Sequence, residues 1–317
     1  MTFYFVIPSW NRSRVIMRTL NSIASQKEKE WYAIIVDDGS TDDTRDVIKP
    51  FLDKHKNKAA YIKKENGGIG SARNKGIEFV LKKTKKDTDW VIFLDSDDSL
   101  IKNGLSVIKR TIKRYPSHKC YFFGAVSEEG ILTFYLKKPI ILIGLKELLK
   151  NYLIGETLPM VSVSVFRNNK YRFDEIVRYN VYSLFFELAR DFGIMCTSNI
   201  ARIYYQDVSY TRSRIQEKNM RNVYNVTKSV IDNWGHEMLK YNRKRYGSDY
   251  LVLARASALT HNRLESIKYF LKGLLYNPLD FKRIGLYVIS FIDYKFKLNN
   301  FILYRSNKNR KDVGKVY

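Results

Sequence analysis

Crowded carboxylates near the end of the first hundred residues are the clearest chemical signal in this chain. The apolar pair Phe93-Leu94 is followed by Asp-Ser-Asp-Asp at positions 95–98. Like charges this close raise one another's pKa unless a cation or hydrogen-bond donors compensate. Carboxylate oxygens suit Mg²⁺ or Mn²⁺, which proteins hold through one or two carboxylates plus substrate phosphates. The run indicates a metal site, and its alternative is a helix N-terminus capped by Asp97, Asp98 or Ser99.

A second acidic cluster, Asp-Asp-Gly-Ser-Thr-Asp, occupies positions 37–42. An acid just past a strand end, such as Asp38, accepts hydrogen bonds from a base N–H or from ribose hydroxyls. The same letters are typical of a turn followed by a helix N-cap, which needs no ligand. Taken alone, the cluster favours the turn.

A glycine-rich segment at 66–76 (NGGIGSARNKG) stands before a predicted helix. Glycines at such a place let backbone N–H groups approach a phosphate, and the helix dipole favours an anion there. Arg73 lies one turn into the helix and can reach the same anion. The spacing is neither that of a Walker loop nor that of a Rossmann fingerprint.

Alternating strands and helices must position these clusters. Short apolar runs predict strands, and apolar residues at helical spacing predict helices between them. The strands are expected at 2–7, 32–36, 59–62, 90–94 and 121–123, and the helices at 15–25, 41–55, 69–81 and 105–115. This alternation indicates βαβ units with a largely parallel sheet, in which ligands bind outside the carboxyl ends of the strands. From about residue 219 the pattern is helical and basic.

Four motifs in order within 98 residues resemble those of the family-2 glycosyltransferases. They are Pro8-Ser9-Trp10-Asn11-Arg12, VDDGSTDDT, ENGGIGSARNKGI and FLDSDD. Trp10 stands where the family usually has Tyr. The resemblance implies an α/β, Rossmann-like GT-A fold, with a mostly parallel sheet flanked by helices and a C-terminal helical appendage. It implies a GT-A domain at 1–215 (nucleotide-sugar binding at 1–125, acceptor side at 126–215) and a basic helical region at 216–317.

The resemblance also assigns roles to residues. Those implied to bind the nucleotide sugar are Pro8, Trp10, Asn11, Arg12, Asp38, Gly67, Gly68, Arg73, Asp95 and Ser96. Asp38 would contact the base, and Asp37 would support the turn. Asp97 would ligate a divalent metal, Mn²⁺ or Mg²⁺, while Asp95 would bind ribose or a water on that metal. The metal would neutralise the departing diphosphate.

The match fails where inverting members of the family usually carry the general base. They have F-D-E-x-x-x-x-x-E-D, whereas this chain has Phe173-Asp174-Glu175 followed by Val181-Tyr182 in place of Glu-Asp. A tyrosine with a pKa near 10 is a poor base at neutral pH. Glu156, Asp174 and Glu187 are candidate replacements, although Asp174 also suits a helix N-cap and Glu187 a solvated helix face. Otherwise the two patterns are out of register, or the chain binds donor without efficient transfer.

A basic segment near residues 202–214 is the last expected part of the donor site. Family members often have Y-R-x-H here, in a loop over the donor, and Gln206 or Asp207 falls where the His would be. Arg212 and Arg214 are expected either to close on the diphosphate or to belong to an ordinary basic loop.

Composition and charge narrow the partners. The 317 residues carry a net charge of +24, and 45% are hydrophobic. With 23 Tyr and 18 Phe, the chain is not expected to be disordered. Two cysteines do not make a disulfide framework or a zinc site. No signal peptide is visible, and the apolar run 284–292 is too short for the ~20 residues of a membrane span.

Charge and motifs together predict a metal-dependent, inverting transferase that uses a nucleotide sugar, most simply a UDP-sugar. The implied acceptor is a lipid-linked surface glycan such as O-antigen, capsule or lipooligosaccharide. Residues 201–317 hold 23 basic and 9 acidic side chains, a net charge of +14. This predicts a cytoplasmic enzyme held peripherally on the inner face of the membrane by its anionic surface, with no nucleic acid bound. The alternatives are a catalytically degenerate sugar-nucleotide binder and a basic nucleic-acid-binding protein.

Overall fold

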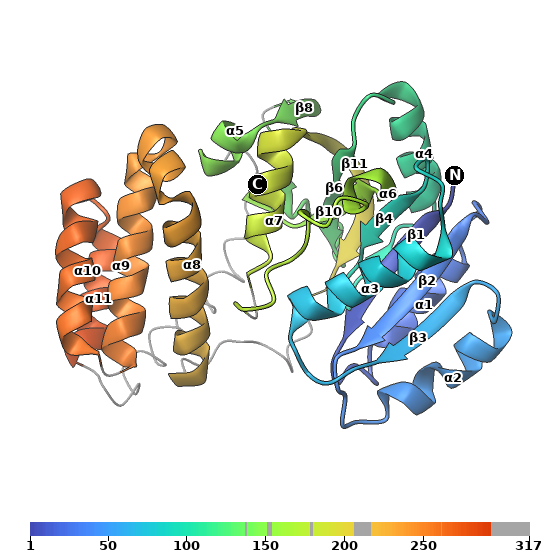
Figure 1. Ribbon diagram of the computed structural model, residues 1–317, viewed down its shortest axis with the longest axis horizontal. Helices are drawn as coiled ribbons and strands as arrows, with labels where there is room; N and C mark the ends of the chain where they lie inside the picture. The colour runs from blue at the N-terminus through green and yellow to red at the C-terminus, as the bar shows by residue number, and fades with distance from the viewer. Residues whose placement is uncertain (137, 151–153, 178–179, 206–216, 261, 293–317) are drawn as a thin grey trace. The chain divides into compact units, whose positions relative to one another are not determined.

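The computed structural model describes residues 1–317 except 137, 151–153, 178–179, 206–216, 261 and 293–317. The chain divides into two compact units, Met1–Gln206 and Asp207–Tyr317 (Figure 1). The predicted domain boundary between residues 215 and 216 lies outside the described residues.

The first unit alternates strands and helices as the sequence predicts. Its elements up to the sixth strand are β1 (Phe3–Ser9), α1 (Ile16–Ala24), β2 (Trp31–Asp37), α2 (Thr44–Lys54), β3 (Ala59–Lys63), α3 (Ile69–Lys83), β4 (Trp90–Phe93), β5 (Ser99–Leu100), α4 (Gly104–Arg114) and β6 (Cys120–Ser127). The remainder are β7 (Phe134–Tyr135), β8 (Ile140–Ile143), α5 (Leu145–Leu149), β9 (Ile154–Gly155), β10 (Thr157–Ser162), α6 (Val163–Phe166), α7 (Tyr182–Asp191) and β11 (Ile194–Tyr204).

Nine of the described strands form one mixed sheet. Its order is β3-β2-β1-β4-β10-β6-β11-β5, and β8 also pairs with β11. The strands β3, β2, β1 and β4 are parallel, as are β6 and β11, whereas β10 runs antiparallel between β4 and β6. The predicted α/β sheet flanked by helices is confirmed. The antiparallel direction of β10 was not predicted, because an apolar run indicates burial of a strand and carries no information on its direction.

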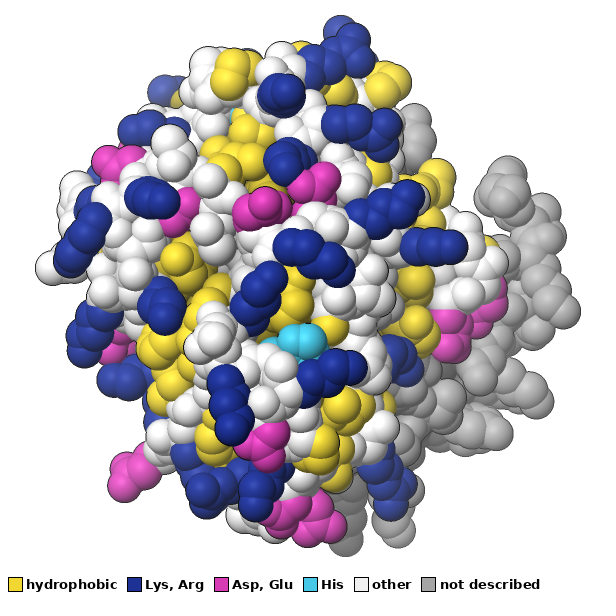
Figure 2. All heavy atoms as spheres, turned by 90° about the vertical axis from the view of Figure 1, so that its right-hand side faces the viewer, with side chains coloured by type: hydrophobic (Ala, Val, Ile, Leu, Met, Phe, Trp, Pro, Cys, Tyr) yellow, Lys and Arg dark blue, Asp and Glu magenta, His cyan; other side chains and the backbone are white. Residues whose placement is uncertain are grey.

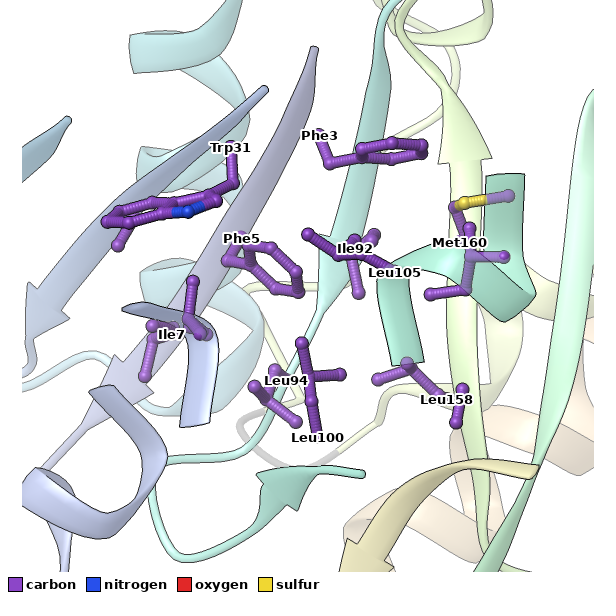
Figure 3. Packing of buried hydrophobic residues seen from close by; sticks show 14 of the residues in the cluster. Phe3, Phe5, Ile7, Trp31, Ile92, Leu94, Leu100, Leu105, Leu158 and Met160 are labelled. Atoms are coloured by element: carbon purple, nitrogen blue, oxygen red, sulfur yellow. The ribbon is translucent and has the colours of Figure 1, made fainter. Parts of the chain in front are cut away.

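The sheet is buried on both faces because alternate residues of each central strand enter different cores. Phe3, Phe5 and Ile7 of β1 pack in one cluster with Ile92 and Leu105 (Figure 3). The intervening residues of β1 pack in a second cluster on the other face. This two-sided burial accounts for the near-continuous apolar strands in the sequence.

Helix α3 lies directly on the sheet through a glycine. A Cβ added at Gly76 would lie 2.4 Å from Cγ1 of Val6 in β1. The last glycine of the glycine-rich segment therefore permits close helix–sheet packing, which holds the beginning of α3 near the carboxyl ends of the strands.

The second unit is helical, as predicted. It consists of α8 (Glu217–Tyr241), α9 (Arg243–Leu259), α10 (Arg263–Tyr276) and α11 (Phe281–Ile292), and α9 contacts each of the other three. Ala254, Ala258 and Tyr287 form its small apolar core. Among the described helices, none combines the length and the apolar character that crossing a membrane requires.

Candidate functional site

The first two motifs meet because β1 and β2 end side by side. Ser9 is paired in register with Asp37, so the segments after each strand are neighbours. Asn11 has φ 52°, and its Oδ1 accepts from the backbone N–H of Thr41 at 2.8 Å. The hydroxyl of Ser40 accepts from the backbone N–H of Asn11 at 2.9 Å. The side-chain oxygen of Asn11 therefore joins the two loops.

The neighbouring donor-site candidates have different exposure. Pro8 is buried within β1, whereas the side chain of Trp10 is 52% exposed just past the end of the strand. The backbone N–H of Arg12 donates to Oγ1 of Thr44 at 3.0 Å, which fixes the backbone before the guanidinium. Trp10 and Arg12 are thus the members of this motif with side chains available at the sheet edge.

Asp37 and Asp38 have separate structural tasks. Oδ1 of Asp37 accepts from the backbone N–H of Ser40 at 2.7 Å, and its Oδ2 accepts from the hydroxyl of Tyr61. Asp37 therefore supports the turn. The predicted cap at Ser40 or Thr41 is wrong, because α2 begins only at Thr44 and the hydroxyl of Ser40 is used by Asn11.

Asp38 anchors the glycine-rich segment. Its carboxylate accepts from the backbone N–H of Gly67 at 2.8 Å and of Gly68 at 2.7 Å, and it pairs with Nζ of Lys64 at 2.8 Å. These two N–H groups, which the motif alone directs at a phosphate, donate to a carboxylate instead. Gly68 has φ 91°, a left-handed conformation that favours glycine. The second and third motifs are therefore one structural unit.

Asp95 lies between two buried arginines. Nη2 of Arg73 is 2.9 Å from its Oδ1, and Nη2 of Arg202 is 3.3 Å from its Oδ2. The Arg73 guanidinium also lies between the rings of Phe93 and Phe173, with centroids at 5.6 and 5.3 Å. The predicted proximity of Arg73 and the acidic run is thus present, and it takes the form of an ion pair.

Asp97 is the accessible carboxylate of the acidic run. Its side chain is 36% exposed, and Oδ2 lies 3.4 Å from Nη2 of Arg12. The backbone around it is held from α1, since Thr19 donates to the carbonyl of Ser96 at 2.9 Å and Arg18 donates to the carbonyl of Asp97. Asp97 therefore projects from a fixed backbone toward the first motif, while Ser96 is buried.

Arg202 of β11 is a central residue of this cluster that reasoning from the sequence missed. Its side chain is 4% exposed, and its guanidinium contacts Asp98 directly. It also lies 3.7 Å from Oε2 of Glu156 and donates to the carbonyl of Thr157 at 2.6 Å. The available signal was an arginine within an otherwise apolar strand, because a buried arginine requires carboxylate partners.

Electrostatics distinguish the three carboxylates. Burial opposes ionisation of Asp95, but Arg73 and Arg202 outweigh it and lower its pKa. Burial and the neighbouring Asp95 raise the pKa of Asp97. Burial raises the pKa of Asp98 to about 7, against the influence of Arg202. Asp95 is therefore held as an anion, whereas ionised Asp97 gains from any cation placed beside it.

The donor set fits a divalent cation bound together with a diphosphate. Arg12, Arg73 and Arg202 are already ion-paired with the acidic run, so the cluster has little surplus positive charge for an anionic ligand. Within the described residues, no three His, Cys, Asp or Glu side chains gather closely enough to form a metal site by themselves. A divalent ion held by Asp97 would complete its shell with phosphate oxygens and water, as Mg²⁺ commonly does.

The three candidate bases lie in different surroundings. Glu156 alone has a described ion pair with the Asp95 cluster, through Arg202, and its side chain is 47% exposed. Oδ1 of Asp174 accepts from the backbone N–H groups of Ile176 and Val177 at 2.9 and 3.0 Å, which makes it a turn cap. Burial raises the pKa of Glu187 on α7, whose charged neighbours are Arg190, Lys170 and Asp191.

Two expected parts of the site are missing from the described residues. Val181 and Tyr182 stand at the beginning of α7 and provide no carboxylate. Gln206, Asp207, Arg212 and Arg214 lie outside the described residues. Tyr205, just before them, donates its backbone N–H to Asp98 at 3.1 Å, and its ring lies 3.4 Å from the Arg18 guanidinium carbon.

Sequence comparison agrees with this arrangement. Residues 4–169 match the model of the family described as Glycosyl transferase family 2. The chain therefore belongs to this family of glycosyltransferases.

Curated relatives match over about a third of the chain. The putative teichuronic acid biosynthesis glycosyltransferase TuaG of Bacillus subtilis is 36% identical over 100 residues, which are 32% of this chain and 37% of TuaG. The poly(ribitol-phosphate) beta-N-acetylglucosaminyltransferase TarS of Staphylococcus aureus is 31% identical over 107 residues, 33% of this chain and 18% of TarS. The chain spans well under half the length of the curated relatives it matches.

Solved structures share the fold over nearly the whole chain. S. aureus TarS 1–349 in complex with UDP-GlcNAc superposes with a TM-score of 0.58 at 17% identity, covering 93% of this chain and 92% of that one. A mannosyltransferase from Pyrobaculum calidifontis in complex with GDP-Man and Mn²⁺ gives 0.53 at 12% identity, covering 92% and 86%. The GT-A fold with C-terminal helices is thereby confirmed.

Proposed function

We propose that this protein transfers a sugar from a UDP-sugar to a surface glycan, with inversion at the anomeric carbon and with the aid of a divalent metal. The carrying observation is the cluster of Asp95, Asp97, Asp98, Arg73 and Arg202 at the carboxyl end of β4. Fixed charges beside a departing diphosphate stabilise the charge that develops as the glycosidic bond breaks. The comparisons support the donor class, since TarS has been solved with UDP and UDP-GlcNAc.

Each group of site residues has a proposed part in donor binding. Pro8, Trp10, Asn11 and Asp38 surround the base, and Gly67, Gly68 and Arg73 border the ribose and diphosphate. Asp95 and Ser96 bind the ribose side of the donor, with Arg12 beside the phosphates. When bound by Asp97, Mn²⁺ or Mg²⁺ neutralises charge on the leaving diphosphate. Arg73 and Arg202 keep Asp95 ionised, so its orientation is maintained throughout the reaction.

Glu156 is the proposed base that takes the proton from the acceptor hydroxyl. It lies beside the donor cluster, half exposed, at the point where β9 leads into β10. Arg202 stabilises its ionised form, which is the form that accepts a proton. Asp174 is occupied as a turn cap, and Glu187 has other charged neighbours.

The proposed acceptor is a lipid-linked glycan, so the enzyme would act peripherally at the inner face of the cytoplasmic membrane. The names of TarS and TuaG concern cell-surface polymers, and residues 201–317 have a net charge of +14. Each Lys or Arg close to an anionic leaflet contributes about 1 kcal/mol. We assign residues 1–215 to catalysis and 216–317 to this attachment.

Metal-dependent donor binding tests the site. We expect UDP to bind more tightly with Mn²⁺ than without it, and Asp97→Asn to reduce the Mn²⁺-dependent affinity by at least about tenfold, or 1.4 kcal/mol. The control is Asp53→Asn, an exposed acid on α2. Calorimetric titration gives both affinities, and an unchanged affinity for Asp97→Asn would contradict the metal assignment.

Glu156→Gln tests the base. We expect transfer from the cognate UDP-sugar to fall by about 10²–10⁴-fold, with UDP affinity unchanged. Glu187→Gln is the matched control and should retain transfer. Normal transfer by Glu156→Gln would place the base elsewhere.

The absence of a carboxylate at Val181 and Tyr182 favours one alternative, a protein that binds the sugar nucleotide without transferring the sugar. A screen of nucleotide sugars for thermal stabilisation, followed by measurement of UDP release, separates the two. Stabilisation without turnover on any glycan acceptor would support the binder.

A further inference from the structure

Helix α10 places its small residues inward and its leucines outward. The described residues that it buries are Ser266 and Gly273. Ser266 donates to the carbonyl of Ala254 in α9 at 2.9 Å, and a Cβ added at Gly273 would lie 2.7 Å from Cδ2 of Leu251. Small residues therefore hold α10 close against α9, and the large side chains have no room on that face.

The opposite face of α10 carries a stripe of exposed apolar side chains. Leu264, Leu271 and Leu275 are 78%, 61% and 67% exposed, and Ile267 is 41% exposed. Because these positions are separated by three, four and four residues, they lie on one side of the helix. We call these four residues the leucine stripe. A helix in a soluble protein normally turns such a face to the core, and a contiguous exposed one marks a binding surface.

Apolar exposure continues along the chain into α11. Leu279 in the connecting turn is 70% exposed, and Phe281, Val288 and Ile292 of α11 are 72%, 46% and 72% exposed. The three residues of α11 are separated by seven and four positions, so they also share one helix face. Both helices thus present an apolar stripe that their packing on α9 leaves uncovered among the described residues.

The charges around the leucine stripe are basic. Residues 263–292 contain five basic and two acidic side chains besides Asp293, which lies outside this range. The acids are engaged, since Glu265 accepts from the hydroxyl of Tyr269 at 2.7 Å and Asp280 pairs with Arg283 at 2.7 Å. Lys268 and Lys272 are exposed beside the stripe. A second copy of the chain would bring the same positive charge, whereas an anionic lipid surface complements both the charge and the apolar side chains.

We infer that α10 docks on an anionic membrane surface with the leucine stripe inserted among the acyl chains and with Lys268 and Lys272 at the headgroups. The inference rests on the proposed membrane location of the enzyme, but not on its transfer reaction. It adds a hydrophobic component and a defined helix face to an attachment otherwise due to distributed charge.

Vesicle partitioning of the full-length protein tests this orientation. The triple variant Leu264→Ser/Leu271→Ser/Leu275→Ser should partition at least about tenfold less than the parent onto phosphatidylcholine vesicles containing phosphatidylglycerol. The control Leu132→Ser/Ile176→Ser changes two exposed apolar residues of the first unit, 60% and 97% exposed, and should partition normally. Vesicles of phosphatidylcholine alone should bind the parent weakly.

A fluorescent probe reports insertion directly. Leu271→Trp should shift the emission to shorter wavelength on vesicle binding, with quenching by brominated acyl chains that the parent does not show. Equal partitioning of the triple variant and the parent would overturn the inference. The same holds if brominated acyl chains quench the Leu271→Trp variant no more than they quench the parent.

Two further measurements separate membrane docking from self-association and from a loss of folding. A dimer in sedimentation that the triple variant abolishes, without vesicle binding by the parent, would assign the leucine stripe to self-association and overturn the inference. UDP affinity of the triple variant should equal that of the parent, which shows that the first unit is intact. Failure of the parent to bind UDP would count against the proposed function and leave the vesicle result unaffected.

Discussion

At the scale of single residues, this site depends on carboxylates that hold other parts of the protein as well as on those that face a ligand. Asp38 fixes the backbone of Gly67 and Gly68, and Asp98 balances Arg202. Such buried partners make the exposed Asp97 precise in position. A carboxylate motif therefore reports local architecture together with chemistry.

Loss of Arg202 should be costly because it leaves Asp98 buried without its cation. We expect Arg202→Met to lower the free energy of unfolding by about 3 kcal/mol, and the added change Asp98→Asn to recover much of that loss. Urea denaturation measures both. The control Lys75→Met, which breaks an exposed pair with Glu78, should have little effect. No recovery in the double variant would show that Arg202 acts mainly through its other contacts.

At the scale of elements, helix packing decides what the motifs can do. Gly76 brings α3 against β1, and α9 receives α10 through Gly273. In both places a side chain is absent so that a helix can approach its neighbour. The two consequences differ: the first positions Arg73 beside Asp95, and the second leaves the leucine stripe exposed.

The same substitution should have opposite effects in two helices. Gly76→Ala should destabilise the protein by about 1–3 kcal/mol, because the new Cβ would lie 2.4 Å from Val6. Gly285→Ala on α11, where no atom lies within 4 Å of the new Cβ, should stabilise it by about 0.5–1 kcal/mol. Thermal and urea unfolding measure both changes. A neutral Gly76→Ala would mean that α3 can shift away from β1.

Asp249 on α9 should make stability depend on pH. Burial raises its pKa to about 6, against the influence of Arg245 and Arg283. Between pH 4 and this pKa the folded chain keeps a proton that the unfolded chain has lost, so stability decreases as pH rises. We expect Asp249→Asn to gain on the order of 2 kcal/mol relative to the parent across this interval. Unfolding curves of the two proteins that stay parallel from pH 4 to 7 would contradict this.

At the scale of the whole molecule, charge is distributed over both units. Lysine and arginine side chains are scattered over the face shown in Figure 2, interspersed with fewer acids. The net charge of +24 therefore favours anionic surroundings without defining an orientation. Orientation requires a directional feature, which the leucine stripe of α10 provides in the proposed attachment.

Donor binding should act on one unit. With UDP and Mn²⁺ at 100 times the dissociation constant, stability should rise by about 2.7 kcal/mol. We expect slower amide hydrogen exchange at residues 37–38, 66–74 and 95–98, and no change in α9 and α10. Hydrogen-exchange mass spectrometry measures this distribution. Equal protection of both units would contradict the division of roles between them.

The sequence by itself determined the class of fold and the composition of the donor site. Strand and helix alternation follows from local apolar spacing, and the motifs come from short segments such as 37–42 and 93–98. Both are local properties, so they can be recognised without a structure. The candidate donor residues and the basic helical region were accessible in this way.

Only the tertiary structure decided which of these residues meet and which faces stay open. The pairs Asp38–Gly67, Arg202–Asp98 and Arg202–Glu156 join residues 29, 104 and 46 positions apart, and they depend on the order, direction and register of the strands. The exposure of the leucine stripe depends likewise on α10 packing through Ser266 and Gly273. Residue types predict which interactions are possible, but the packing of distant segments selects those that form.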